Sequence, residues 1–144
     1  MWDDDDEMEE FSKNQNNANR HPILLKIRDI SALTLAIVGS LDEARKELYG
    51  NLMTEDAHLL HAKFLGAEAT DDYILKMENA VLMKIHARQL HTMTYQLAME
   101  STHAEEHLQL LRNAVSDFKK LFVGWIKSFD REQKYSDGWG LFDD

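Results

Sequence analysis

The sequence predicts an all-α fold: an up-down-up-down antiparallel four-helix bundle with a flexible acidic N-terminal arm and an aromatic C-terminal tail. The 144 residues contain one proline and six glycines, too few breakers for a chain of many short strands. Apolar residues recur at alternating spacings of three and four in several long segments, which places each set on one helical stripe. Helices joined by short turns bury such stripes best as a four-helix bundle.

The charge divides the chain into a nearly neutral body and two acidic flanks. Residues 22–129 hold 14 acidic and 12 basic side chains, whereas the flanks together hold 12 acidic and 4 basic ones. Residues 1–21 begin with a run of carboxylates and contain few apolar side chains that could be buried, so we expect a disordered acidic arm. Residues 22–129 are expected to form the bundle and residues 130–144 the tail. No basic stripe predicts direct nucleic-acid binding.

The first helix is expected to run from about Pro22 to Tyr49. Pro22 suits the first turn of a helix, where its missing N–H costs nothing. An apolar heptad continues from there through Gly39, which weakens a helix by roughly 1 kcal/mol relative to Ala. A break near Gly39 and Ser40 is the alternative.

The second and third helices are predicted from turn and cap signals. The pair Gly50-Asn51 predicts a turn, after which Thr54 would cap the second helix. The segment 70–72, Thr-Asp-Asp, would cap a third helix that runs to about Met99. The apolar positions of that helix spread wider than one seam, which predicts burial on two sides and hence a homo-oligomer; they are Ile74, Leu75, Met77, Val81, Leu82, Ile85, Leu90, Met93 and Leu97.

The fourth helix has the clearest pattern in the chain. The segment 102–105, Thr-His-Ala-Glu, matches a capping box and opens it. An unbroken heptad follows, and its members are Leu108, Leu111, Val115, Phe118, Phe122, Trp125 and Phe129. These spacings commit the segment to packing against other helices.

Seven histidines invite the hypothesis of a metal site. Glu55 and His58, and likewise Glu100 and His103, have the Glu-x-x-His spacing found in di-iron bundles. Both pairs are expected at helix ends, where their ligands could not meet at one point in mid-bundle. Cysteine is absent, which removes thiolate ligands. We therefore expect surface histidines, no metal, no cofactor and no catalytic residue set.

Four polar residues are candidates for a site inside the bundle. Glu78, Asn79 and His86 lie on or beside the wide stripe of the third helix, and Glu68 near the end of the second could fold back toward them. Buried polar groups must be hydrogen-bonded, because an unpaired buried carboxylate is very costly. A polar network that fixes the register of the helices is the favoured interpretation. The alternative is an enzyme or metal-binding bundle that uses this Glu/His cluster.

The tail combines Trp139, Leu141 and Phe142 with two glycines, Gly138 and Gly140, that disfavour helix. We expect an irregular segment whose apolar side chains dock on the bundle, on a second copy or on another protein.

Four stretches of the chain are similar to known proteins. They resemble a group of uncharacterised small bacterial four-helix-bundle proteins, over most of residues 22–142, and the stretches are Gly66-Ala67-Glu68, Met77-Glu78-Asn79-Ala80, Phe122–Phe129 and Asp137–Phe142. The helix lengths resemble, more distantly, the bundle proteins encoded within 23S-rRNA intervening sequences. The resemblance implies self-association, with a ring as one arrangement, and implies no catalytic residues.

The sequence therefore predicts a non-enzymatic, self-associating structural or protein-interaction bundle. No apolar stretch approaches the roughly 18–20 residues that span a bilayer, so no membrane contact is expected. No basic region followed by an apolar run opens the chain, so a cytoplasmic location is expected.

Overall fold

The computed structural model describes residues 5–9 and 20–144. It is 78% helix without a strand in the described part, which confirms the all-α class. Most of the predicted disordered arm, residues 1–4 and 10–19, lies outside the described residues. Residues 5–9 are helical, where the sequence suggested no regular structure.

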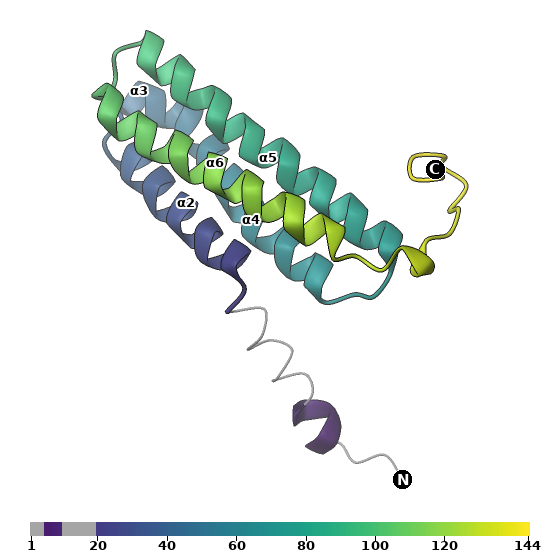
Figure 1. Ribbon diagram of the computed structural model, residues 1–144. Helices are drawn as coiled ribbons and strands as arrows, with labels where there is room; N and C mark the ends of the chain where they lie inside the picture. The colour runs from purple at the N-terminus through teal and green to yellow at the C-terminus, as the bar shows by residue number, and fades with distance from the viewer. Residues whose placement is uncertain (1–4, 10–19) are drawn as a thin grey trace.

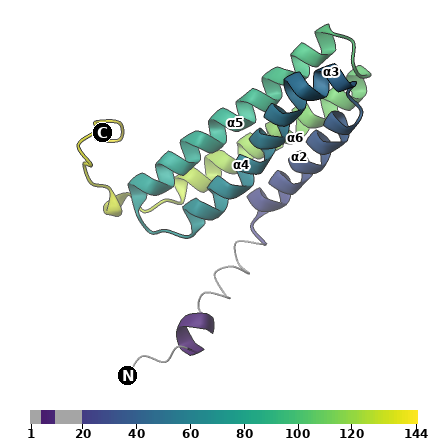
Figure 2. The ribbon, with the colours of Figure 1, turned by 180° about the vertical axis from the view of Figure 1, so that it is seen from behind.

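The described part of the chain has four long helices, which lie side by side, and the chain reverses direction from each to the next (Figure 1). Seen from behind, the same helices lie alongside one another (Figure 2). The first helix contacts the second and fourth, and the third contacts the same two. These helices are α2 (Pro22–Gly39), α4 (Asn51–Glu68), α5 (Tyr73–Met99) and α6 (Glu105–Lys127). The short elements are α3 (Glu43–Arg45), the π-helical η1 (Lys46–Gly50) and the 3-10 turn η2 (Arg131–Gln133).

Helix α2 begins as predicted and ends at the alternative position. Pro22 occupies its first turn, and the Nδ1 atom of His21 accepts a hydrogen bond from the backbone N–H of Ile23 at 3.1 Å. The helix ends at Gly39, so the prediction of one continuous helix to Tyr49 is wrong. The Ser40 hydroxyl donates to backbone carbonyls of the last turn of α2, at 3.0 and 3.1 Å, and thereby satisfies acceptors at the helix end.

The predicted turn at Gly50 is also wrong, because α3, η1 and α4 form one helical run over residues 43–68. Asp42 caps this run by accepting a hydrogen bond from the backbone N–H of Arg45 at 3.0 Å. Gly50 is buried, and a Cβ atom there would lie 3.2 Å from Cγ1 of Val38. The glycine therefore serves close packing of η1 against α2. Thr54 lies inside α4 and caps nothing.

The predicted cap of α5 is confirmed, and the predicted cap of α6 is wrong. Asp72 caps α5 as predicted, since its Oδ1 atom accepts the backbone N–H of Leu75 at 3.1 Å. Ala104 precedes α6 without any side-chain cap, so the predicted capping box does not form. Glu105, which was expected to complete the capping box, instead forms an ion pair with Arg112, seven residues further along the same helix.

The α6 heptad is buried as predicted, with Phe122 half-buried. On α5 the predicted stripe is partly wrong: Leu75, Val81 and Leu82 are exposed, and smaller residues replace them in the core, namely Ala80, Ala87 and Thr94. Small side chains allow a neighbouring helix to approach closely, so helical phase and not residue size decides which α5 positions are buried. None of the described helices combines the length and apolarity needed to cross a bilayer.

Candidate functional site

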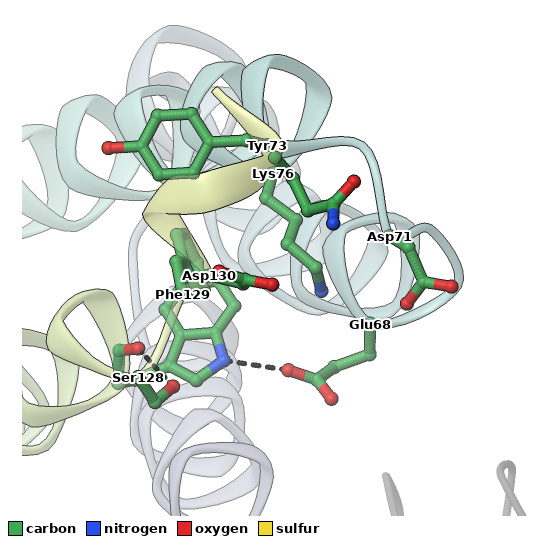
Figure 3. A pocket seen from close by; sticks show the side chains of 9 residues that line it. Glu68, Asp71, Tyr73, Lys76, Ser128, Phe129 and Asp130 are labelled. Carbon is green, nitrogen blue, oxygen red and sulfur yellow. Dashed lines mark hydrogen bonds between the residues drawn. The ribbon is translucent and has the colours of Figure 1, made fainter. Parts of the chain in front are cut away.

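A cavity of about 460 Å³ opens at the end of the molecule where α4 and α6 terminate and α5 begins. Figure 3 shows it from close by, with side chains of the α4–α5 connection facing those that follow α6. Its lining combines aromatic rings, carboxylates and one ammonium group: Glu68, Asp71, Tyr73, Lys76, Trp125, Ser128, Phe129, Asp130 and Gln133. This volume lies within the range of small-ligand pockets.

The floor of the cavity is formed by aromatic side chains that belong to the core. Tyr73, Trp125 and Phe129 are all buried. The rings of Trp125 and Phe129 meet edge to face, with centroids 4.7 Å apart. Trp125 also packs against Phe64, with ring centroids 5.4 Å apart, and the ring of His21 lies 5.2 Å from that of Phe64. Such pairs lock the rings in place.

The polar rim holds three carboxylates, and Glu68 is oriented by the floor. The indole N–H of Trp125 donates to Oε1 of Glu68 at 2.7 Å (Figure 3). Oδ1 of Asp130 accepts the backbone N–H of Glu132 at 3.0 Å, and Asp71 accepts no hydrogen bond from any described residue. Within the described part of the chain, none of these three carboxylates forms an ion pair.

Among the described residues, Lys76 is the one cationic residue that lines the cavity. Its Nζ atom donates to the backbone carbonyl of Ala67 at 2.8 Å and lies 5.4 Å from the centroid of the Phe129 ring. The ammonium is thus held by a carbonyl oxygen and an aromatic face, not by a carboxylate.

The structure separates the four polar residues that the sequence grouped together. Glu68 lies at the cavity, whereas Glu78 is exposed on α5. The Asn79 amide donates to the backbone carbonyl of Leu75 at 2.8 Å and lies against Gly66. The predicted cluster is therefore wrong, because the phase of α5 turns Glu78 away from the core.

His86 does enter a polar pair, with a residue that the sequence analysis did not single out. Its Nδ1 atom hydrogen-bonds Oδ1 of Asp56 on α4 at 2.8 Å. Asp56 is buried, and burial raises the pKa of its carboxyl, while the hydrogen bond from His86 opposes that rise. The spacing of Asp56 from Met53 and Leu60 would have placed it on the buried stripe of α4, which is the signal that was missed.

A second polar network lies at the opposite end of the molecule, where η1 meets the end of α5. The carboxylate of Glu100 accepts hydrogen bonds from Arg45 at 2.9 Å, from Tyr49 at 2.7 Å and from Gln96 at 2.8 Å. Those donors, in the order Gln96, Tyr49 and Arg45, hold the pKa of Glu100 below its usual value. Arg45 also pairs with Asp42. All the charges in this network are therefore partnered.

The two Glu-x-x-His spacings do not bring metal ligands together. His58 is exposed on α4, and His103 hydrogen-bonds Ser40 at 2.6 Å and Thr102 at 2.8 Å in the turn between α5 and α6. In residues 5–9 and 20–144, no group of three histidine or carboxylate residues could hold a metal ion.

The tail is irregular beyond η2, as predicted, with positive φ angles at Gly138 and Gly140. Trp139 is 81% exposed and Leu141 76% exposed, whereas Phe142 is half-buried and packs against the core. Within the described residues, only Phe142 of these three apolar residues packs against a surface of the same chain.

Comparison of the chain with protein-family models, with curated proteins and with solved structures finds no match.

Proposed function

We propose that the protein is a non-enzymatic, up-down-up-down four-helix bundle that self-associates in the cytoplasm and serves as a structural or protein-interaction module. The observation that supports it is an apolar face formed by α4 and α5. Leu75 and Leu82 of α5 are 47% and 37% exposed, and Leu52 of α4 is 55% exposed. A contiguous apolar patch on a protein surface marks an interaction site.

Helical spacing places these three leucines, here called the α4–α5 face, on one side of the molecule. Leu82 precedes His86 by one turn, and Leu52 precedes Asp56 by one turn. The hydrogen bond between His86 and Asp56 therefore ties the two rows of side chains together. Leu75 continues the α5 row, since it lies seven residues before Leu82.

A second copy of this chain is the partner that fits best. The body from residue 22 to 129 has a net charge of only −2, so two copies repel each other weakly. An apolar row can also pack against its own symmetry mate across a two-fold axis. Trp139 and Leu141 offer an additional contact for that copy or for another protein.

Light scattering at micromolar concentration tests the proposal. We expect a mass that is a multiple of 16.7 kDa for the natural chain. The double variant Leu75→Glu/Leu82→Glu should shift toward the monomer. Leu35→Glu/Leu110→Glu is the matched control, because it makes the same change at exposed positions of α2 and α6. A monomer for the natural chain, or equal effects of both variants, would contradict the proposed face.

An enzyme or metal-binding bundle is the second candidate, and the Asp56–His86 pair is the observation that favours it, since aspartate–histidine pairs serve both general-base catalysis and metal binding. Elemental analysis of the purified protein separates the two, because stoichiometric metal would support the second. Removing residues 130–144 and repeating light scattering and pull-down tests the contribution of the tail.

A further inference from the structure

We infer that the cavity at the α4–α5 connection binds an aliphatic ammonium group, carried either by a free diamine or polyamine or by a lysine side chain of another protein. A primary ammonium needs aromatic faces, carboxylates and carbonyl oxygens around it. The cavity supplies the first in Trp125 and Phe129 and the second in Glu68, Asp71 and Asp130.

The protein's own Lys76 shows that an aromatic ring and a backbone carbonyl at the cavity hold an ammonium. Its Nζ atom has entered the cavity, where it lies over the Phe129 ring and donates to the carbonyl of Ala67. That placement leaves all three rim carboxylates without an ion pair in the described structure. The lining therefore has a net charge of −2, which a second cation would offset.

The backbone adds to this preference. Helices α4 and α6 end beside the cavity, at Glu68 and Lys127, so the negative ends of two helix dipoles lie there. The positive end of α5 is also near, but the Asp72 carboxylate caps it. An anionic ligand would meet carboxylates and helix C-termini together, whereas an ammonium meets a favourable field from both.

Both acidic flanks of the chain begin at the same end of the molecule. The N-terminal flank joins α2 at His21, whose ring lies 5.2 Å from the ring of Phe64, and the Phe64 ring lies 5.4 Å from that of Trp125. The C-terminal flank begins at Asp130 on the rim itself. The C-terminal flank, residues 130–144, holds five acidic and two basic residues, and its net charge of −3 attracts cations to this end before they bind.

Fluorescence titration of Trp125 with 1,5-diaminopentane tests the inference. The substitutions Trp2→Phe and Trp139→Phe make Trp125 the single indole, and its N–H contact with Glu68 makes it sensitive to a cation there. We expect a saturable change that weakens as salt is raised. The variant Glu68→Gln/Asp71→Asn/Asp130→Asn should weaken binding at least about tenfold, because it removes charge and keeps each side-chain oxygen as an acceptor.

A matched control removes the same charge from elsewhere. The variant Glu47→Gln/Glu55→Gln/Glu106→Gln changes three exposed carboxylates on η1, α4 and α6, and it should retain binding. Equal weakening in both variants would reveal attraction by net charge alone and would overturn the site. The absence of a saturable change at millimolar amine would overturn it as well.

Two further probes identify the source of the ammonium. If the diamine binds more tightly than a lysine-containing peptide of neutral net charge, the ligand is a free amine; the reverse order assigns a protein lysine. Butyrate should not bind, and saturable binding of butyrate would contradict the cation preference. Light scattering in parallel keeps a failure of amine binding distinct from a failure of self-association.

Discussion

The two ends of the molecule differ in whether their charged side chains have partners. At the end where η1 meets α5, Glu100 accepts three hydrogen bonds, and Arg45 pairs with two carboxylates. At the cavity end, three carboxylates surround an aromatic floor without an ion pair in the described structure, and Lys76 binds a carbonyl instead. Both ends use polar side chains beside a buried core, so the contrast lies in whether those side chains have partners.

This contrast separates a polar group that stabilises the fold from one that is available to a ligand. A satisfied network rigidifies the turn it spans, because each member loses a bond if the turn opens. Charged side chains without partners do not stabilise a turn in this way, and they remain available to bind a ligand of opposite charge. The predictions below test how far each end depends on its own packing.

The largest effect is expected for Trp125→Ala at the cavity end. The side chain is buried and packs on Phe64, Phe122 and Phe129, so its loss should lower the free energy of unfolding by about 3–5 kcal/mol. Urea denaturation followed by circular dichroism measures this change. A shift in the urea midpoint too small to resolve would show that the aromatic floor is not part of the core.

Trp125→Phe is the control that separates packing from the hydrogen bond to Glu68. It keeps an aromatic ring and removes the indole N–H, so it should cost clearly less than the alanine variant. If both variants cost the same, the contact with Glu68 would account for the effect, and the floor would be less rigid than its ring contacts suggest.

A smaller effect, visible as a pH dependence, is expected at the network end. Hydrogen bonds hold the pKa of Glu100 below its ordinary value of 4.5, so the folded state prefers the charged carboxylate. This contribution is present above pH 4.5 and is lost as pH falls through the lowered pKa. Glu100→Gln should remove that part of the acid-side loss, measured as the slope of the urea midpoint against pH. An unchanged slope would mean that the network does not stabilise the fold.

The two ends also show what the sequence could predict. The heptad of α6 was predicted correctly because its stripe is apolar on one side only, so its phase is unambiguous. Helix α5 is apolar on several sides, so the pattern could not show that Leu75 faces water while Ala80 is buried. Phase there is set by contact with α4 and α6, which no local pattern records.

Contacts between distant segments also decide the surroundings of the site residues. Glu68 was grouped with residues inside the bundle, but it is exposed at the cavity, and its partner Trp125, 57 residues away, was recognised only as a core residue. Gly50 was mistaken for a turn because a buried glycine and a turn glycine look alike in sequence; the neighbour that requires it, Val38, comes from another helix. Contacts between distant segments are therefore what the sequence could not supply.

A modest effect is expected in the tail, which leaves the cavity end. Phe142→Ser should lower stability by about 1 kcal/mol, because the ring is half-buried against the core. Trp139→Ser and Leu141→Ser should each change it by less than about 0.5 kcal/mol, because both side chains are largely exposed. Urea denaturation of dilute protein measures the three. A large loss from Trp139→Ser would show a docked tail, and a concentration-dependent loss would assign the contact to a second copy.

The smallest effect on stability is expected from removal of residues 1–19. The trimmed chain keeps His21, whose Nδ1 atom caps α2 and whose ring packs on Phe64, so the cavity end keeps its contacts. The removed segment is rich in charge and poor in apolar residues, so we expect a change within about 0.5 kcal/mol in urea denaturation. A marked loss would mean that Trp2 or Phe11 contributes to the folded core.

The same trimmed chain sharpens the comparison of the two ends. It loses seven acidic residues and one basic residue from a segment attached at the cavity end. If the arm only raises the local concentration of cations, 1,5-diaminopentane should bind more weakly than to the full chain at low salt and equally well at high salt, where the field is screened. A loss that persists at high salt would place the arm in direct contact with the ligand. An unchanged affinity at both salt concentrations would leave the three rim carboxylates, Glu68, Asp71 and Asp130, as the source of the attraction.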